Sequence, residues 1–169
     1  MTDTNASTDT GVLKSRHLGP IELVGGVGGA VMETTITIAE RPIEVRIEID
    51  HPTRFSESVV ASIDFAFDGF ARTDELSRQV IGEALRRSAS SAPAKLLERW
   101  GLHTGTEDPD PEAFLRRLHP VRTTIMPDGG RENLERVIMI YAFDDPGVAG
   151  LLTVRFRQGT WPEVDPGLR

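Results

Sequence analysis

Three carboxylates share one face of a predicted helix in the first half of the chain. Glu57, Asp64 and Asp68 are separated by seven and four residues, and such separations stack side chains along one side of a helix. Acidic groups placed in this way form either an ordinary solvated helix face or a contact strip for a basic protein, where complementary charge raises the association rate and the selectivity. We therefore take Glu57, Asp64 and Asp68 as candidate partner-binding residues.

The sequence contains no pattern that is typical of catalysis or metal binding. Its histidines are His17, His51, His103 and His119. No two of them stand four residues apart, and the HExxH motif is missing. The chain also has no cysteine and no Gly-x-Ser-x-Gly motif, which removes thiol chemistry and the nucleophile elbow of the hydrolases. We expect no catalytic residue, no bound metal and no cofactor.

A glycine-rich stretch, GGVGG at 25–29, invites a nucleotide-binding interpretation. A dinucleotide fingerprint needs its glycines between a strand and a helix. Here the glycines precede β-branched residues that are typical of a strand. The stretch therefore predicts a loop.

Composition and charge limit the classes of partner. The 169 residues carry a formal net charge of −7, with a pI near 5.1. An acidic chain is poorly suited to general binding of nucleic-acid phosphates, whereas a basic protein has the matching charge. No apolar run approaches the about 20 residues that span a membrane, and the first residues lack the segments of a secretory signal. With the absence of cysteine, these features predict a cytoplasmic protein that binds neither nucleic acid nor membrane.

The polar residues 1–16 predict a disordered tail. Residues 17–169 are long enough for a single domain with its own core.

The clearest pattern inside this domain is the alternation of apolar and polar residues over 31–50. A period of two predicts a pair of strands, because successive side chains of a strand point to opposite faces. With Glu40 and Arg41 as the loop, apolar residues would face one another across the hairpin. The predicted pairs are Ile38 with Ile43, Ile36 with Val45, and Met32 with Ile49.

Apolar residues that recur about every fourth position predict two helices after this hairpin. The first covers about 53–68 and carries the acidic strip. The second begins at a Thr73 cap and extends to about residue 90. Pro93 ends or kinks it, and a further helical stretch closes at Gly101. We expect the two long helices to pack as an antiparallel pair on the apolar face of the sheet.

The last third of the chain predicts a short helix, capped by Asp110, and three more strands. The strands cover about 120–126, 134–143 and 151–156, with turn sequences such as PDGG between them. Strands thus come first, helices next and strands last. This order predicts an α+β fold with a mainly antiparallel sheet, built from N- and C-terminal strands and covered by a central helical pair.

Two segments of the C-terminal half, LHPVRTTIMPDGGRENL and VIMIYAFDDPGVAGLLTVRF, resemble a bacterial family of small proteins known as a domain of unknown function, the DUF2004-like family. In the N-terminal half, LGPIEL and TTITIAERPIEVRIEID match the glycine-marked strand and the apolar hairpin of that family. The GGVGG loop departs from the family pattern. The resemblance covers about residues 18–165 and implies the same order of elements. It implies no catalytic residue.

Two hypotheses of function follow from the charge and from the lack of a catalytic constellation. The first is a non-enzymatic protein-binding module, such as an immunity-like inhibitor that occupies the cleft of a basic toxin or enzyme. The second is a small-molecule-binding protein or enzyme with a pocket between the sheet and the helices, lined by Tyr141, Trp100 and His119. A third alternative is a homodimer that forms through exposed edge strands.

Overall fold

The computed structural model describes residues 13–26, 29–128 and 135–166. Seven strands form one sheet in the order β3-β4-β5-β6-β7-β8-β9, and β1 pairs with β2 in a separate small hairpin. The strands are β1 (Lys14–Ser15), β2 (Gly19–Pro20), β3 (Val24–Gly26), β4 (Gly29–Ile38), β5 (Arg41–Ile49), β6 (Leu118–Ile125), β7 (Glu135–Phe143), β8 (Leu151–Arg157) and β9 (Glu163–Pro166). The helices are η1 (Pro52–Arg54), α1 (Glu57–Asp68), α2 (Phe70–Arg87), α3 (Ala92–Thr104) and α4 (Pro111–Arg117).

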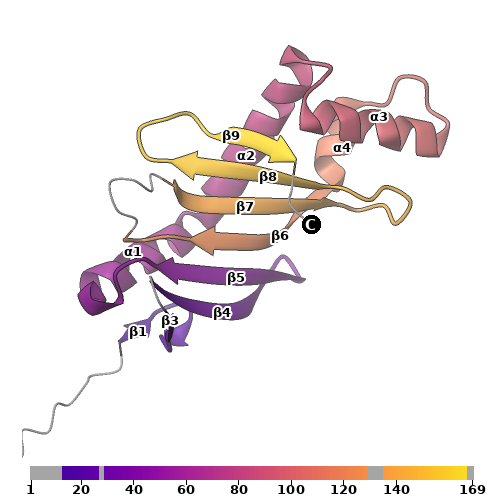
Figure 1. Ribbon diagram of the computed structural model, residues 1–169. Coiled ribbons are helices and arrows are strands. Elements are labelled where there is room, and N and C mark those ends of the chain that lie inside the picture. The colour runs from indigo at the N-terminus through magenta and orange to yellow at the C-terminus, as the bar shows by residue number, and fades with distance from the viewer. Residues whose placement is uncertain (1–12, 27–28, 129–134, 167–169) are drawn as a thin grey trace, which may run out of the picture.

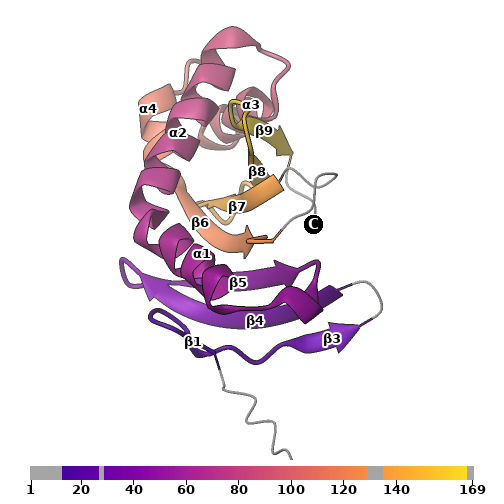
Figure 2. The same cartoon turned by 90° about the vertical axis from the view of Figure 1, so that its left-hand side faces the viewer.

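The long helices cover one face of the large sheet. α1 and α2 lie behind the strands in Figure 1, and Figure 2 shows them along one side of the sheet. Neighbouring strands pair antiparallel except β5 and β6, which are parallel. This architecture confirms the predicted α+β fold and its mainly antiparallel sheet of N- and C-terminal strands.

The β4–β5 hairpin forms as the alternation predicts, but its register differs by two residues. The observed pairs are Ile36 with Ile43, Thr34 with Val45, Met32 with Ile47, and Ala30 with Ile49. The predicted pairs of Ile38 with Ile43, Ile36 with Val45, and Met32 with Ile49 were therefore wrong. A slip of two residues leaves each side chain on its own face. The apolar face was thus predicted correctly, and its β5 members Ile43, Val45, Ile47 and Ile49 are all buried.

The loop of this hairpin explains the difference in register. Ala39 and Glu40 form the loop, and Ile38 lies opposite Arg41. The φ angles of Ala39 and Glu40 are 49° and 64°, and two positive φ angles are what a two-residue type I′ turn requires. Nothing in the sequence Ala-Glu predicts such a turn, because asparagine and glycine are the residues that favour it.

Helices α1 and α2 follow one another with only Gly69 between them. In Figure 2, α2 continues away from the end of α1 instead of folding back beside it. The predicted antiparallel pair was therefore wrong, since a reversal between helices needs a loop of at least about two residues. The predicted cap at Thr73 was also wrong. α2 begins at Phe70, and Thr73 Oγ1 donates a hydrogen bond to the Gly69 carbonyl inside the helix (3.1 Å).

Helix α3 continues through Gly101, where the sequence predicted its end. It stops at Thr104, and Gly105 closes it with a φ of 71°. A Cβ atom on Gly101 would lie 2.8 Å from the carbonyl oxygen of Thr106. Close packing of the following loop is therefore the reason for glycine at position 101.

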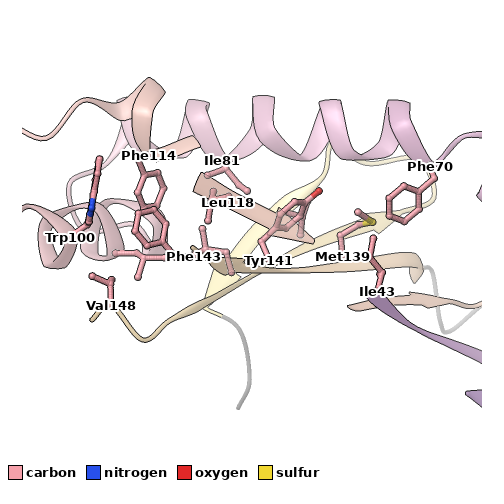
Figure 3. Close-up of a cluster of buried hydrophobic side chains, with 13 residues drawn as sticks. Ile43, Phe70, Ile81, Trp100, Phe114, Leu118, Met139, Tyr141, Phe143 and Val148 are labelled. Carbon is pink, nitrogen blue, oxygen red and sulfur yellow. The ribbon is translucent and has the colours of Figure 1, made fainter. Parts of the chain in front are cut away.

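The sheet and the helices enclose two apolar clusters. Figure 3 shows the larger one, with Tyr141 and Met139 of β7 beneath α2 and Trp100, Phe114 and Phe143 together at one end. The ring centroids of Phe114 and Phe143 are 5.0 Å apart, and those of Trp100 and Phe143 are 5.5 Å apart. The smaller cluster consists of Ala30, Val45, Ile47, Ile49, Ile63, Phe67 and Ile125. It holds α1 against β4, β5 and β6.

Replacement of Ala39 by Asn and Glu40 by Gly should stabilise the protein. A left-handed conformation costs an ordinary residue about 1–2 kcal/mol, and Asn-Gly is the preferred type I′ pair. We expect the free energy of unfolding in urea to rise by about 1 kcal/mol. A Thr37→Gly control in the adjoining strand should lower it. A loss of stability in the Asn-Gly variant would contradict the turn described here.

Candidate functional site

Two members of the acidic strip lie against the N-terminal hairpin. Asp64 is only 6% exposed, and it accepts hydrogen bonds from Ser15 Oγ (2.6 Å) and from the Arg16 backbone N–H (3.0 Å). Asp68 contacts the Arg16 guanidinium (2.8 Å) and His17 Nε2 (2.9 Å). These contacts give Asp64 and Asp68 a structural role, because they fasten the β1–β2 hairpin to α1.

The remaining member, Glu57, is exposed in the first turn of α1. Contact of all three carboxylates with one partner stays a prediction, although the buried Asp64 offers such a partner little surface. The anchoring also bears on the disordered tail predicted for residues 1–16. Residues 1–12 lie outside the described part of the chain, but Lys14 and Ser15 form β1, so the prediction was wrong for these two residues.

The hairpin contacts change the pKa values of both carboxyl groups. Burial by itself raises the pKa of Asp64, but hydrogen bonds from Ser15 and Arg16 and the charge of Arg16 outweigh it and hold that pKa below its usual value. Hydrogen bonds from His17 and Arg16 lower the pKa of Asp68. Both groups are therefore ionised at neutral pH.

A pocket lies at the seam between the parallel strands β5 and β6. The two strands pair only where Glu44–Ile47 lies beside Arg122–Ile125, and a bulge interrupts β6 just before that register. Pro42 and Pro120 occupy the unpaired ends, and neither has an N–H group to extend the ladder. The resulting cavity of about 560 Å³ is bounded by α2, α4 and the first residues of β5 and β6. We call it the seam pocket, and its size is typical of small-molecule sites.

Arginines gather around the seam pocket although the protein as a whole is acidic. Its ionisable lining residues are the arginines Arg41, Arg78, Arg116 and Arg117, the histidine His119, and the aspartates Asp68 and Asp74. Its apolar lining includes Ile38, Ile43, Phe67, Phe70 and Leu118. The amino end of α2 borders the pocket, where the helix dipole is positive, and so does the carboxyl end of α1, where it is negative. Three of the four arginines are paired with carboxylates, Arg41 with Asp144, Arg78 with Asp74 and Arg116 with Asp110. The pocket thus combines arginine side chains with an apolar floor.

Arg117 is the arginine of the pocket that is best placed to receive an anion. Among the described residues it has no carboxylate within ion-pair distance. Its guanidinium lies 5.4 Å from the centre of the Trp100 ring and donates a long hydrogen bond to the Asp144 carbonyl (3.4 Å). The Asp144 carboxylate is occupied by Arg41 at 2.9 Å, and this hydrogen bond lowers the pKa of Asp144. The side chain of Arg117 is therefore held in place without a direct ion pair, although the Asp144 carboxylate is near enough to interact with its charge.

A partly buried hydrogen-bond network fixes the wall of the seam pocket. The phenol of Tyr141 donates to Asp74 Oδ1 (2.7 Å), and Arg78 Nε donates to Asp74 Oδ2 (3.0 Å). Arg78 also donates to the Leu115 carbonyl (2.7 Å). Figure 3 shows the Tyr141 oxygen pointing toward α2. Burial, with the charge of Asp74 as a second cause, raises the pKa of Tyr141 far above its usual value, so the phenol remains a donor at every physiological pH.

The structure places the three residues that were predicted to line a pocket in different positions. His119 lines the seam pocket, and its buried Nδ1 has no hydrogen-bond partner among the described residues. Tyr141 is fully buried behind the wall and acts through Asp74. Trp100 belongs to the core cluster and contacts the pocket only through Arg117.

None of Asp74, Arg78 and Arg117 was predicted to lie at a pocket. The available signal was the four-residue spacing of Asp74 and Arg78, which is typical of an ion pair along a helix. Nothing along the chain indicates the contact of Asp74 with Tyr141.

Comparison of the chain with protein family models, curated proteins and solved structures gives no significant match, so the resemblance to the DUF2004-like family stays a prediction. Within residues 13–26, 29–128 and 135–166, no three His, Asp or Glu side chains are grouped closely enough to hold a metal ion. None of the helices in these ranges has the length and apolar character needed to cross a membrane.

Replacement of Asp64 by Asn should destabilise the protein by about 1–3 kcal/mol, because it leaves buried donors without their charged acceptor. Glu57→Gln on the same helix is the matched control and should have little effect.

The contribution of Asp64 to the free energy of unfolding depends on pH. A lowered folded-state pKa contributes stability above the unfolded value of about 4, and this contribution disappears as the pH falls through the folded-state pKa. Acid unfolding of Asp64→Asn should therefore be less steep than that of the wild type, and equal slopes would contradict the anchoring role.

Replacement of Tyr141 by Phe should lower the free energy of unfolding by about 1 kcal/mol, because the hydrogen bond to Asp74 is lost while the ring remains. The volume-conserving control Met139→Leu, two residues before Tyr141 in β7, tests packing alone. Amide hydrogen exchange should rise around Asp74 in Tyr141→Phe and not in Met139→Leu. Unchanged stability and exchange would show that the network does not hold the pocket wall.

Proposed function

We propose that the protein binds a small anionic molecule with an apolar body in the seam pocket. The observation that carries this proposal is an arginine without a direct ion pair among the described residues, Arg117, beside an apolar floor. Such a guanidinium can attract an anion locally even in a chain whose net charge is −7.

The anionic group would bind Arg117. Arginine presents planar, paired donors that match carboxylate and phosphate oxygens, and the Trp100 ring beneath this guanidinium restricts its motion. His119 also lines the pocket, although its Nδ1 is buried. An anion at this position would give Arg117 the direct ion pair that it lacks among the described residues.

The body of the ligand would lie on the apolar floor. Ile43, Phe67 and Phe70 line the pocket, and burial of apolar surface contributes roughly 25 cal/mol for each Å². Tyr141 and Arg78 would act as positioning residues, because they hold Asp74 in the wall. The proposal concerns binding and assigns no reaction to the site. A cytoplasmic location forms part of it, supported by the absence of cysteine from the sequence.

Binding can be tested by calorimetry with octanoate, octyl phosphate and 3-phenylpropionate, and with octanamide and 3-phenylpropionamide as uncharged counterparts. We expect each amide to bind at least about tenfold more weakly than its acid, and Arg117→Gln to weaken the acids about tenfold. Octyl phosphate against octanoate separates a phosphate site from a carboxylate site. Arg87→Gln, at the far end of α2, is the matched control and should bind like the wild type. Equal affinity for acids and amides, or no effect of Arg117→Gln, would contradict the proposal.

A further inference from the structure

We infer that a groove between α3 and the loop after it docks a basic, apolar-anchored segment of another protein. The groove measures about 610 Å³ and lies on a different part of the surface from the seam pocket. Its apolar lining includes Leu97, Leu102 and Pro109, and its acidic lining consists of Glu98, Glu107 and Asp108. This inference does not depend on the function proposed for the seam pocket.

The groove is built on a fixed backbone. The loop returns along α3 and packs directly on Gly101, where an added Cβ would lie 3.0 Å from Pro109 Cγ. The Thr106 N–H donates to the Gly101 carbonyl (2.9 Å), and Thr104 Oγ1 donates to Thr106 Oγ1 (3.0 Å). At its other end the loop enters α4, where the Asp110 carboxylate caps the first turn. Both ends of the loop are thus held, so a partner would meet a preformed surface.

An apolar side chain stands free on the rim of this groove. Leu102 is 76% exposed, although it belongs to α3, whose other apolar residues Leu96 and Trp100 are buried. A single exposed leucine is common on protein surfaces. Its position beside the partly buried Leu97 and a proline-bearing loop gives it the surroundings of a contact residue.

The carboxylates of the groove have no cationic partners in the described structure. Elsewhere on the surface many carboxylates are paired with arginine, among them Glu33, Glu44, Glu48, Asp144, Glu163 and Asp165. Glu98, Glu107 and Asp108 form no such pair within residues 13–26, 29–128 and 135–166. The groove therefore presents three uncompensated negative charges around an apolar centre.

This combination selects a protein segment with lysine or arginine around an apolar anchor. Positive side chains would neutralise the rim and speed association, while the anchor would be buried against Leu97 and Leu102 in the manner of a helix in a groove. Nucleic acids and anionic membranes are unsuitable occupants, because their phosphates would meet three carboxylates. A basic protein also agrees with the partner that the net charge predicts, at a place where the carboxylates are free to meet it.

The test measures fluorescence anisotropy of a labelled amphipathic peptide built from the repeat Lys-Leu-Leu-Lys. Two control peptides replace its lysines with glutamate or its leucines with serine. We expect the wild-type protein to bind the basic peptide and neither control. Two variants, the triple neutralisation Glu98→Gln, Glu107→Gln, Asp108→Asn and the single Leu102→Ser, should each weaken binding about tenfold.

Matched controls lie elsewhere on the surface. Glu75→Gln removes an exposed carboxylate of α2, and Phe65→Ser removes an exposed apolar side chain of α1. Both controls, and Arg117→Gln in the seam pocket, should bind the peptide with the wild-type affinity. The inference is overturned if the wild type does not bind the basic peptide, or if the triple variant or Leu102→Ser binds it as tightly as the wild type does.

Discussion

The parallel pairing of β5 with β6 determines both the architecture and the position of the seam pocket. Parallel neighbours cannot be joined by a tight turn, so the chain must travel between them through α1, α2, α3 and α4. That path places the helices on one face of the sheet. The pairing is also short, because it includes only Glu44–Ile47 and Arg122–Ile125. Beyond it the strands have no shared ladder, and the space that they leave is covered by α2 and α4.

Many charged side chains on the described surface are paired, and two hollows hold unpaired ones. Cross-strand ion pairs such as Arg46 with Glu33 and Arg122 with Glu44 neutralise the open face of the sheet. The seam pocket departs from this balance at Arg117, which has no carboxylate at ion-pair distance among the described residues. The α3 groove departs from it with Glu98, Glu107 and Asp108, which have no cationic partner in the same ranges. Surface pairs contribute little to stability, whereas uncompensated groups around a hollow are positioned to act on something outside the chain. These two places are therefore where we assign binding.

The sequence predicted the features that depend on local periodicity. Alternation identified the buried face of β5, and apolar residues at about every fourth position identified α1 as a helix with one buried side. It could not predict the register of the hairpin, because Ala39 and Glu40 adopt left-handed conformations that their side chains do not favour. It also could not distinguish Asp64 from a solvated carboxylate, since the residues that cover it lie near position 15 and arrive through tertiary folding.

The same limit applies to the candidate site. A pocket between sheet and helices with His119 in its lining could be predicted, but the cations around it come from β5, α2 and α4. Their convergence depends on the parallel seam, and no pattern along the chain predicts that β5 pairs with β6. The roles of Tyr141 and Trp100 differ from the prediction for a related reason. Aromatic residues on a central strand or a buried helix face usually pack in the core. Here Tyr141 contacts the pocket lining through Asp74, and Trp100 contacts it through Arg117.

Nuclear magnetic resonance can observe directly whether the seam pocket receives an anion. Arginine Nε–Hε and histidine ring signals of the wild-type protein would be followed during a titration with octanoate. We expect saturable shifts at Arg117, Arg78 and His119, with one common dissociation constant, while Arg87 and Arg99 stay unchanged. Shifts spread evenly over surface arginines, or no saturable shift at Arg117, would contradict the proposed anion site.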